Sequence, residues 1–216
     1  MNNVILTDAD GVLLNWEYAF DCWMEEKGYT PLTRDIYDVI SRYGLDKEEK
    51  DLLVRSFNES AAIGFLPPLR DAIHYVRKLH EEHGYIFRVI TSLSLNKHAG
   101  RLRQKNLFKL FGTAIDDVLC LDTGADKDEA LAPYKDSGMI WVEDKPENAD
   151  LGASLGLQSY LVEHKHNMNH DNDDVIIPNY FVPFKKENSK IYFASDCPKG
   201  KGLTIFKADG DQDRPN

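Results

Sequence analysis

Short apolar runs alternate with longer amphipathic stretches along most of the chain. Five apolar runs predict buried strands, at residues 4–7, 85–91, 118–121, 139–142 and 158–162. Helical periodicity follows most of them, at residues 68–83, 96–111, 128–135 and 146–155. Because strands that alternate with helices form βαβ units, the pattern predicts an α/β fold. We expect a three-layer, doubly wound parallel sheet with helices on both faces.

Residues 15–65 interrupt this alternation, because they contain no convincing strand. Helical periodicity covers residues 16–27 and 47–60, and Pro67 and Pro68 follow the stretch. Ligands of open α/β sheets bind at the carboxyl ends of the strands. An insertion that leaves the end of the first strand is therefore predicted to cover such a site as a small helical cap.

The predicted domains are a core of residues 1–14 and 66–184, a cap of residues 15–65 and a C-terminal extension of residues 185–216. Within the core, residues 164–174 predict a polar loop and residues 175–184 a last strand. In the extension, residues 191–193 and 203–206 flank a Pro/Gly/Lys turn and predict a hairpin. Residues 209–216 are typical of a disordered tail.

Composition and charge narrow the classes of partner. The net charge of −10 over 216 residues disfavours nucleic acid, which needs a basic face. A small anionic substrate stays compatible, since a site can be locally positive or hold a metal. Three dispersed cysteines predict a reducing compartment without a disulfide framework. No stretch could span a bilayer and no leader pattern begins the sequence, so we expect a cytoplasmic monomer or homodimer.

Three predicted strands end in polar residues that can act together. Asp8 and Asp10 precede a glycine after the first strand, and two carboxylates there can converge on one hard cation. The hydroxyls of Thr91 and Ser92 end the second strand, where they can hold a phosphoryl oxygen. Asp144 follows the fourth strand. Taken singly, these motifs also fit a solvated turn, an ordinary strand end and a helix cap.

The order of acid pair, hydroxyl and acid, with Lys127 before the last, resembles the haloacid dehalogenase-like (HAD) hydrolase superfamily over residues 4–162. The resemblance implies a Rossmann-like core and a phosphatase that uses Mg²⁺. Asp8 would attack phosphorus to form an aspartyl-phosphate, and Asp10 would act as acid and base. Asp8, the backbone carbonyl of Asp10 and Asp144 would hold the metal. Thr91 and Lys127 would bind the phosphoryl group.

For three assignments near the site, the sequence leaves an alternative open. Lys127 is preferred to Lys135 as the active-site lysine. Trp16 and Phe20 could bind a substrate base, but with Trp23 they also form one helical stripe, which favours a role in the core of the cap. The loop with His164, His166 and His170 lacks the ligand spacing of a structural zinc site, which favours a polar loop beside the active site.

The short helical cap is most similar to that of the 5′(3′)-deoxyribonucleotidases. We therefore expect a phosphomonoesterase acting on a small phosphorylated metabolite such as a (deoxy)nucleoside monophosphate. Alternatives that use the same site chemistry are a polynucleotide-end or protein phosphatase and a phosphomutase. A non-catalytic binding module is least favoured, because all the expected acids are present.

Overall fold

The computed structural model describes residues 3–33, 36–69 and 71–177, and the backbone of 184–186, 189–194 and 204–207. Five parallel strands form the central sheet, in the order β3-β2-β1-β4-β5. They are β1 (Val4–Thr7), β2 (Ile86–Ser92), β3 (Ile115–Leu121), β4 (Ile140–Glu143) and β5 (Gln158–Leu161). The predicted α/β class and the parallel, doubly wound sheet are confirmed.

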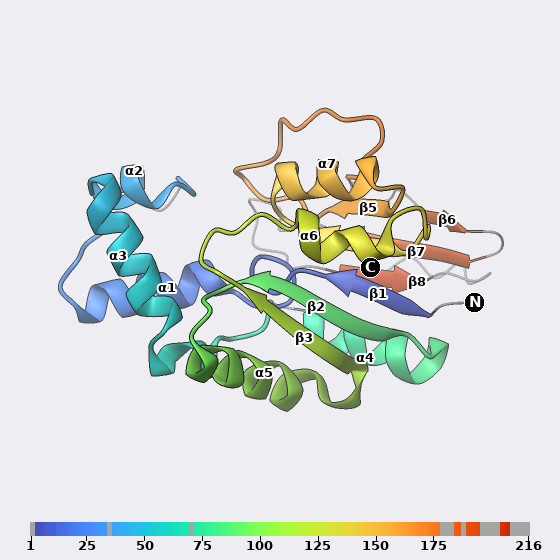
Figure 1. Cartoon of the computed structure of the whole chain (residues 1–216), viewed down its shortest axis with the longest axis horizontal. Coiled ribbons are helices and arrows are strands. Elements are labelled where there is room, and N and C mark those ends of the chain that lie inside the picture. Colours follow the sequence, from blue (N-terminus) through green and yellow to red (C-terminus); the bar gives the residue numbers. More distant parts are fainter. Residues whose placement is uncertain are drawn as a thin grey trace, which may run out of the picture.

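Helices cover both faces of this sheet (Figure 1). On one side lie α4 (Ala72–His83) and α5 (Lys97–Phe111), and on the other lie α6 (Asp128–Leu131) and α7 (Pro146–Ser154). Short 3₁₀ turns follow α5 as η2 (Gly112–Ala114) and α6 as η3 (Ala132–Tyr134). The chain leaves β1 toward β2 on one side, whereas β4 continues to β5 on the other, so the sheet order reverses between β1 and β4.

The segment between β1 and β2 begins with helices that extend beyond the carboxyl ends of the strands (Figure 1). It contains α1 (Trp16–Glu26), α2 (Val39–Tyr43), α3 (Lys47–Asn58) and η1 (Ala61–Phe65). Asp46 caps α3 reciprocally with Glu49, and Gly44 ends α2 in a left-handed conformation. We call residues 15–65 the cap, while its boundary as a separate domain stays a prediction.

Two predicted elements differ in the structure. Helix α4 begins at Ala72 rather than at residue 68, because Leu14 bridges Pro68 in an extended segment. Residues 175–177 form no strand, and Ile176 makes a single bridge to Tyr160 of β5. The rest of that predicted strand up to residue 183 lies outside the described residues.

The C-terminal extension contributes a separate antiparallel sheet with the order β6-β7-β8. Its strands are β6 (Phe184–Lys186), β7 (Ser189–Ala194) and β8 (Thr204–Lys207). Strands β7 and β8 pair across the predicted turn, whose residues lie outside the described part of the chain. The predicted disordered tail, residues 209–216, lies outside it as well.

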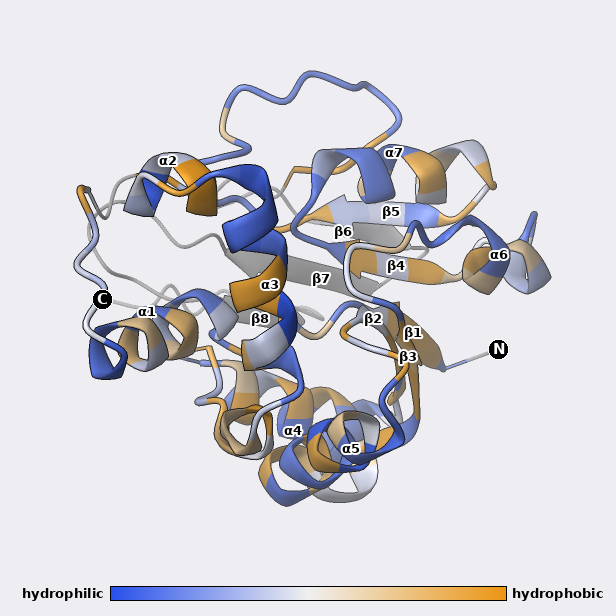
Figure 2. Ribbon diagram, turned by 60° about the vertical axis from the view of Figure 1, so that its left-hand side comes forward, coloured by the Kyte–Doolittle hydropathy of each residue, from blue (hydrophilic) through white to orange (hydrophobic). Residues whose placement is uncertain are grey.

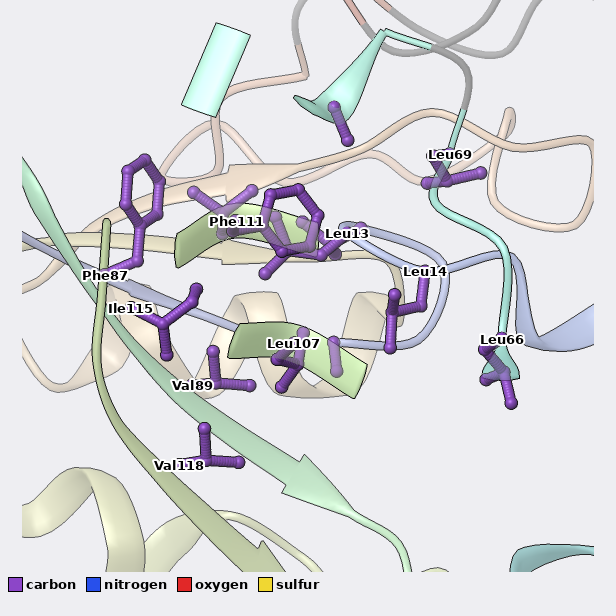
Figure 3. Close-up of a cluster of buried hydrophobic side chains, with 14 of the residues drawn as sticks. Leu13, Leu14, Leu66, Leu69, Phe87, Val89, Leu107, Phe111, Ile115 and Val118 are labelled. Carbon is purple, nitrogen blue, oxygen red and sulfur yellow. The ribbon is translucent and has the colours of Figure 1, made fainter. Parts of the chain in front are cut away.

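Each face of the parallel sheet has its own hydrophobic cluster, because successive strand side chains point to opposite faces. Ile5 and Val89 pack in the cluster that includes α4 and α5, and Leu6 and Trp141 pack with α6 and α7. In Figure 2, β1 and β4 carry mainly the hydrophobic colour, as expected for strands covered on both faces. Figure 3 shows part of the first cluster, with Leu13, Leu14, Leu66, Leu69, Phe87, Val89, Leu107, Phe111, Ile115 and Val118 labelled.

Among the described residues, none of the helices combines the length and the apolar character needed to cross a membrane.

Candidate active site

Asp8 lies directly after β1, at the point where the sheet order reverses. Its backbone N–H donates to the carbonyl of Val142 in β4 at 2.9 Å, which joins the two strand ends. Its Oδ1 accepts the backbone N–H of Ala9 at 2.7 Å. The side chain is almost fully buried. The backbone therefore fixes the Asp8 carboxylate through Oδ1, and Oδ2 is left to contact Lys127.

Gly11 allows the loop after β1 to pass against Asp144. Its φ of +73° lies in the left-handed region, and a Cβ there would stand 2.2 Å from Asp144 Oδ2. No other residue fits this position without displacing the Asp144 carboxylate. The glycine that follows the two predicted acids is thus needed for close approach as well as for the turn.

Three buried acids gather between β1 and β4. Oxygens of Asp8, Glu143 and Asp144 all lie within 4.8 Å of one another. Burial, with the nearby Asp8, raises the pKa of Glu143 well above its usual value. Burial also raises the pKa of Asp144, to about 6. Such crowding of carboxylates is costly unless positive charge compensates it.

The donor set of this cluster fits a magnesium ion, because Mg²⁺ prefers carboxylate and carbonyl oxygens. Asp8 and Asp144, with the carbonyl of Asp10 in the adjacent loop, could hold such an ion. Glu143 is less free to do so, since its oxygens accept hydrogen bonds from Asn148 Nδ2 at 2.5 Å and Lys127 Nζ at 3.2 Å. Sequence reasoning did not assign Glu143 a role, although its place beside Asp144 was the signal.

Lys127 supplies one compensating charge inside the protein. Its Nζ lies 3.1 Å from Asp8 Oδ2 and 3.2 Å from Glu143 Oε2, and the side chain is 1% exposed. The Trp141 ring lies below the ammonium group, with 5.1 Å between Nζ and the ring centroid. Burial alone would lower the pKa of Lys127, but the two carboxylates raise it, so the lysine stays charged. The exposed Lys135 does not line the cavity described below.

Asp10 is bound by a buried arginine that sequence reasoning missed. Arg103 of α5 donates from Nη1 to Oδ1 at 2.5 Å and from Nη2 to Oδ2 at 2.9 Å. Burial raises the pKa of Asp10 above its usual value, and the guanidinium group partly offsets that rise. The signal in the sequence was a charged residue on an apolar stripe, because Ala99, Arg103 and Leu107 follow one another at spacings of four.

The two hydroxyls at the end of β2 face different surroundings. Thr91 is fully buried, and its Oγ1 has no hydrogen-bond partner. Ser92 lines the cavity and donates from Oγ to the carbonyl of Ala125 at 2.8 Å. Side-chain alternation along a strand therefore places Ser92 rather than Thr91 at the cavity surface. That Thr91 holds the phosphoryl group stays a prediction, although its side chain does not line the cavity.

The loop after β5 folds back onto the site. His164 Nε2 donates to the carbonyl of Gly11 at 2.7 Å, and Asn167 Nδ2 donates to the carbonyl of Asp144 at 2.7 Å. His170 instead contacts Asp150 in α7, with 2.8 Å between Nε2 and Oδ1. His164 and His166 stack on each other with 5.5 Å between ring centroids and contact the backbone of Gly11 and Asp144, whereas His170 contacts a different side chain.

A cavity of about 420 Å³ lies between these acids and the cap. Asp8, Asp10, Lys127 and Asp144 line its core side, and Trp16, Tyr37 and Arg42 are among the cap residues that line it. Tyr37 stacks on His166 with 3.8 Å between ring centroids, so cap and core touch here.

The aromatic residues of α1 take different roles around this cavity. Trp16 reaches it and donates from Nε1 to Asn58 Oδ1 at 2.9 Å. Phe20 is fully buried beneath Trp16, with 4.7 Å between ring centroids, and does not line the cavity. Its predicted contact with substrate has no support in this arrangement, because Phe20 belongs to the core of the cap.

Comparison with known proteins gives limited likeness, and no family model matches the chain. An uncharacterized 32.4 kDa protein from the Gp30-rIII intergenic region of Enterobacteria phage T4 is 27% identical over 165 residues. That match covers 72% of this chain and 58% of the phage protein, so the chain spans less than two thirds of its relative.

Two solved structures overlap with most of the chain. A protein from Thermotoga maritima named as a β-phosphoglucomutase has a TM-score of 0.47 at 18% identity, and covers 79% of this chain and 88% of its own. A haloacid dehalogenase-like hydrolase from Burkholderia xenovorans LB400 has a TM-score of 0.44 at 15% identity, covering 81% and 91% respectively.

Proposed function

We propose that this protein is a Mg²⁺-dependent phosphomonoester hydrolase of the HAD type. The observation that carries the proposal is the place of Lys127, buried between Asp8 and Glu143 with Asp144 beside them. The group lies where the sheet order reverses and opens into a cavity. An anchored carboxylate, a fixed cation and further acids for a metal are what phosphoryl transfer requires, since it depends on positioning and electrostatic stabilisation.

In the proposed reaction, Oδ2 of Asp8 attacks phosphorus while the ester P–O bond breaks. Asp10 gives a proton to the leaving oxygen, which departs as an alcohol. Water then attacks the aspartyl-phosphate and loses its proton to Asp10, and the bond between Asp8 and phosphorus breaks to release phosphate. The burial that raises the pKa of Asp10 favours its role as the acid.

Lys127 would hold the Asp8 carboxylate in place and neutralise charge on the phosphoryl group. Ser92 lines the cavity and could donate a hydrogen bond to that group, whereas Thr91 does not line it. Bound magnesium would neutralise the carboxylates and polarise the phosphoryl oxygens. His164 and Asn167 would hold the backbone at Gly11 and Asp144, beside the residues that would bind that ion.

The substrate we propose is a small phosphorylated metabolite such as a (deoxy)nucleoside monophosphate. A cavity of about 420 Å³ is within the range of small-molecule sites. Trp16 and Tyr37 offer aromatic surface along it. A polynucleotide end or a protein substrate would need to reach the acids past the cap, and a phosphomutase would need to retain and return the phosphoryl group.

A panel assay tests this function. Phosphate release is measured with and without Mg²⁺ from nucleoside monophosphates, sugar phosphates and a phosphorylated oligonucleotide, with Asp8→Asn as control. We expect Mg²⁺-dependent release from a small ester by the wild type and none by the variant. Equal release by the variant would contradict the mechanism. Release from the oligonucleotide alone would contradict the small substrate, and isomerisation of a sugar phosphate without release would favour the mutase.

A further inference from the structure

Arg103 is a fully buried cation that the proposed mechanism does not use. Its side chain is 0% exposed, and it does not line the cavity. Both of its terminal nitrogens bind Asp10, which lies 93 residues earlier in the chain. A buried guanidinium group is costly unless it is paired, so this helix position requires Asp10 as its partner.

We infer that Arg103 is a positioning residue that aims the Asp10 carboxylate at the leaving group. This inference rests on the proposed function, because it assigns Arg103 to the acid–base step of that reaction. Two parallel N–H···O bonds fix the plane of a carboxylate as well as its place, which a single bond does not. The loop that carries Asp10 would otherwise leave that side chain free to turn.

The surroundings of Asp10 favour this role over a contact that only supports the fold. Asp10 lines the cavity, and its side chain is 22% exposed, so one edge of the carboxylate stays open to a substrate. Arg103 approaches from α5, whose Ala99 and Leu107 are fully buried beside the sheet. A residue anchored in a rigid layer thus holds a group that faces the reaction, and small errors in such placement are costly to catalysis.

A positioning role has a kinetic signature that depends on the leaving group. p-Nitrophenyl phosphate releases a weakly basic phenolate that needs little help from an acid, whereas benzyl phosphate releases an alkoxide that must be protonated. The two esters carry similar rings. Loss of Arg103 should therefore slow benzyl phosphate far more than p-nitrophenyl phosphate.

The experiment compares Arg103→Met, Arg103→Lys and the matched control Arg101→Met, an exposed arginine on the same helix. We expect Arg103→Met to lower kcat/KM for benzyl phosphate about 10–100-fold and for p-nitrophenyl phosphate only a few-fold, since general acid catalysis contributes about 100-fold or more. Arg103→Lys keeps the positive charge but cannot make two parallel hydrogen bonds to Asp10. It should therefore lower kcat/KM less, again more for benzyl phosphate than for p-nitrophenyl phosphate. Arg101→Met should change neither value.

A second measurement keeps the inference testable if Arg103→Met folds poorly. Unfolding temperatures of Asp10→Asn, Arg103→Met and the double variant, all without Mg²⁺, report whether the two side chains are coupled. We expect the double variant to lose less than the sum of the single losses.

Equal kinetic losses on both esters, or additive shifts in unfolding temperature, would overturn the inference while leaving the proposed function intact. A wild type that releases no phosphate with Mg²⁺ from these esters or from the small esters of the panel assay would contradict the proposed function, and the inference with it.

Discussion

The two walls of the cavity each hold one buried cation, and the two cations have different partners. On the core wall, Lys127 binds Asp8 and Glu143, which lie at the ends of two strands, and Asp8 lines the cavity. On the cap wall, Arg42 binds Glu17 and, at 3.2 Å, Asp21. Both of these carboxylates belong to α1, so the ion pairs of Arg42 join α2 to α1.

Under the proposed function, this difference separates a charge that would act in the reaction from a charge that supports the fold of the cap. Lys127 contacts Asp8, the proposed nucleophile, whereas Arg42 connects two helices of the cap. Asp21 is further satisfied by the hydroxyl of Tyr43, which donates to it at 2.6 Å. Burial and a carboxylate partner thus do not by themselves identify a catalytic cation. Lys127 differs from Arg42 because its partners, Asp8 and Glu143, lie at the ends of strands of the sheet.

The largest effect is expected at the core wall. Lys127→Met should lower kcat about 10³-fold, because it removes a fixed charge from the transferring phosphoryl group. Steady-state phosphate release measures this, with the exposed Lys135→Met as the control that should keep wild-type activity. If Lys135→Met lost activity and Lys127→Met did not, the assignment of the lysine would be wrong.

At the cap wall, Arg42→Met should reduce stability more than chemistry. Losing a cation from a buried pair costs about 3 kcal/mol or more, because the remaining charge stays uncompensated. Chemical denaturation measures the loss, and kcat of the folded fraction should change only a few-fold. If Arg42→Met kept its stability but lost most of its kcat, Arg42 would be a catalytic group. The two buried cations would then not differ in role as proposed.

Asp144 is the residue through which we expect pH and Mg²⁺ to change the stability of the protein. Because burial raises its pKa to about 6, from 3.8, the folded metal-free protein retains a proton that the unfolded chain has released. The stability that comes from this proton is present below about pH 4 and is lost as pH rises through about 6. Over the same interval the carboxylate becomes free to bind a cation.

We therefore expect Mg²⁺ to raise the unfolding temperature, and to raise it more above about pH 6 than below it. A bound ligand at a hundred times its dissociation constant stabilises by about 2.7 kcal/mol. Asp144→Asn should abolish this response, while Asp173→Asn, which removes an exposed carboxylate, should keep it. A full Mg²⁺ response in Asp144→Asn would place the metal elsewhere.

A smaller effect is expected where the cap meets the core. Tyr37 stacks on His166, and burial together with the nearby carboxylates raises the pKa of its hydroxyl, which stays neutral. Tyr37→Leu should raise KM about 10-fold for a substrate that fills the cavity, with a smaller change in kcat, since about 1.4 kcal/mol of contact would be lost. Tyr18→Leu, on an exposed face of α1, is the control. Unchanged KM in Tyr37→Leu would remove Tyr37 from the binding surface.

The sequence predicted which residues lie on the core wall, because the pattern of apolar residues shows where the strands end. Apolar runs located the strands, and parallel strands bring the residues that follow them to one edge. Asp8 and Asp144 were predicted in this way, whereas Lys127 was predicted from the resemblance to a known family. The same reasoning placed Thr91 at the site, but its side chain is fully buried, and Ser92 rather than Thr91 lines the cavity.

The cap wall and Arg103 could not be predicted as readily. Trp16 and Phe20 share one helical stripe, and the spacing alone does not tell which ring reaches the cavity and which lies beneath it. The partner of Arg103 is 93 residues away, and no local pattern connects an arginine in α5 to the loop after β1. Such contacts depend on how the layers pack, which periodicity does not specify.

The most direct test of the central claim is the mass of the Asp8 peptide after rapid acid quench during turnover with Mg²⁺. If Asp8 is the nucleophile, this peptide gains the mass of one phosphoryl group, located on Asp8, and the gain is absent from Asp8→Asn and from reactions without Mg²⁺. Turnover that proceeds at the wild-type rate in Asp8→Asn, or a phosphoryl group found on another residue, would contradict the account.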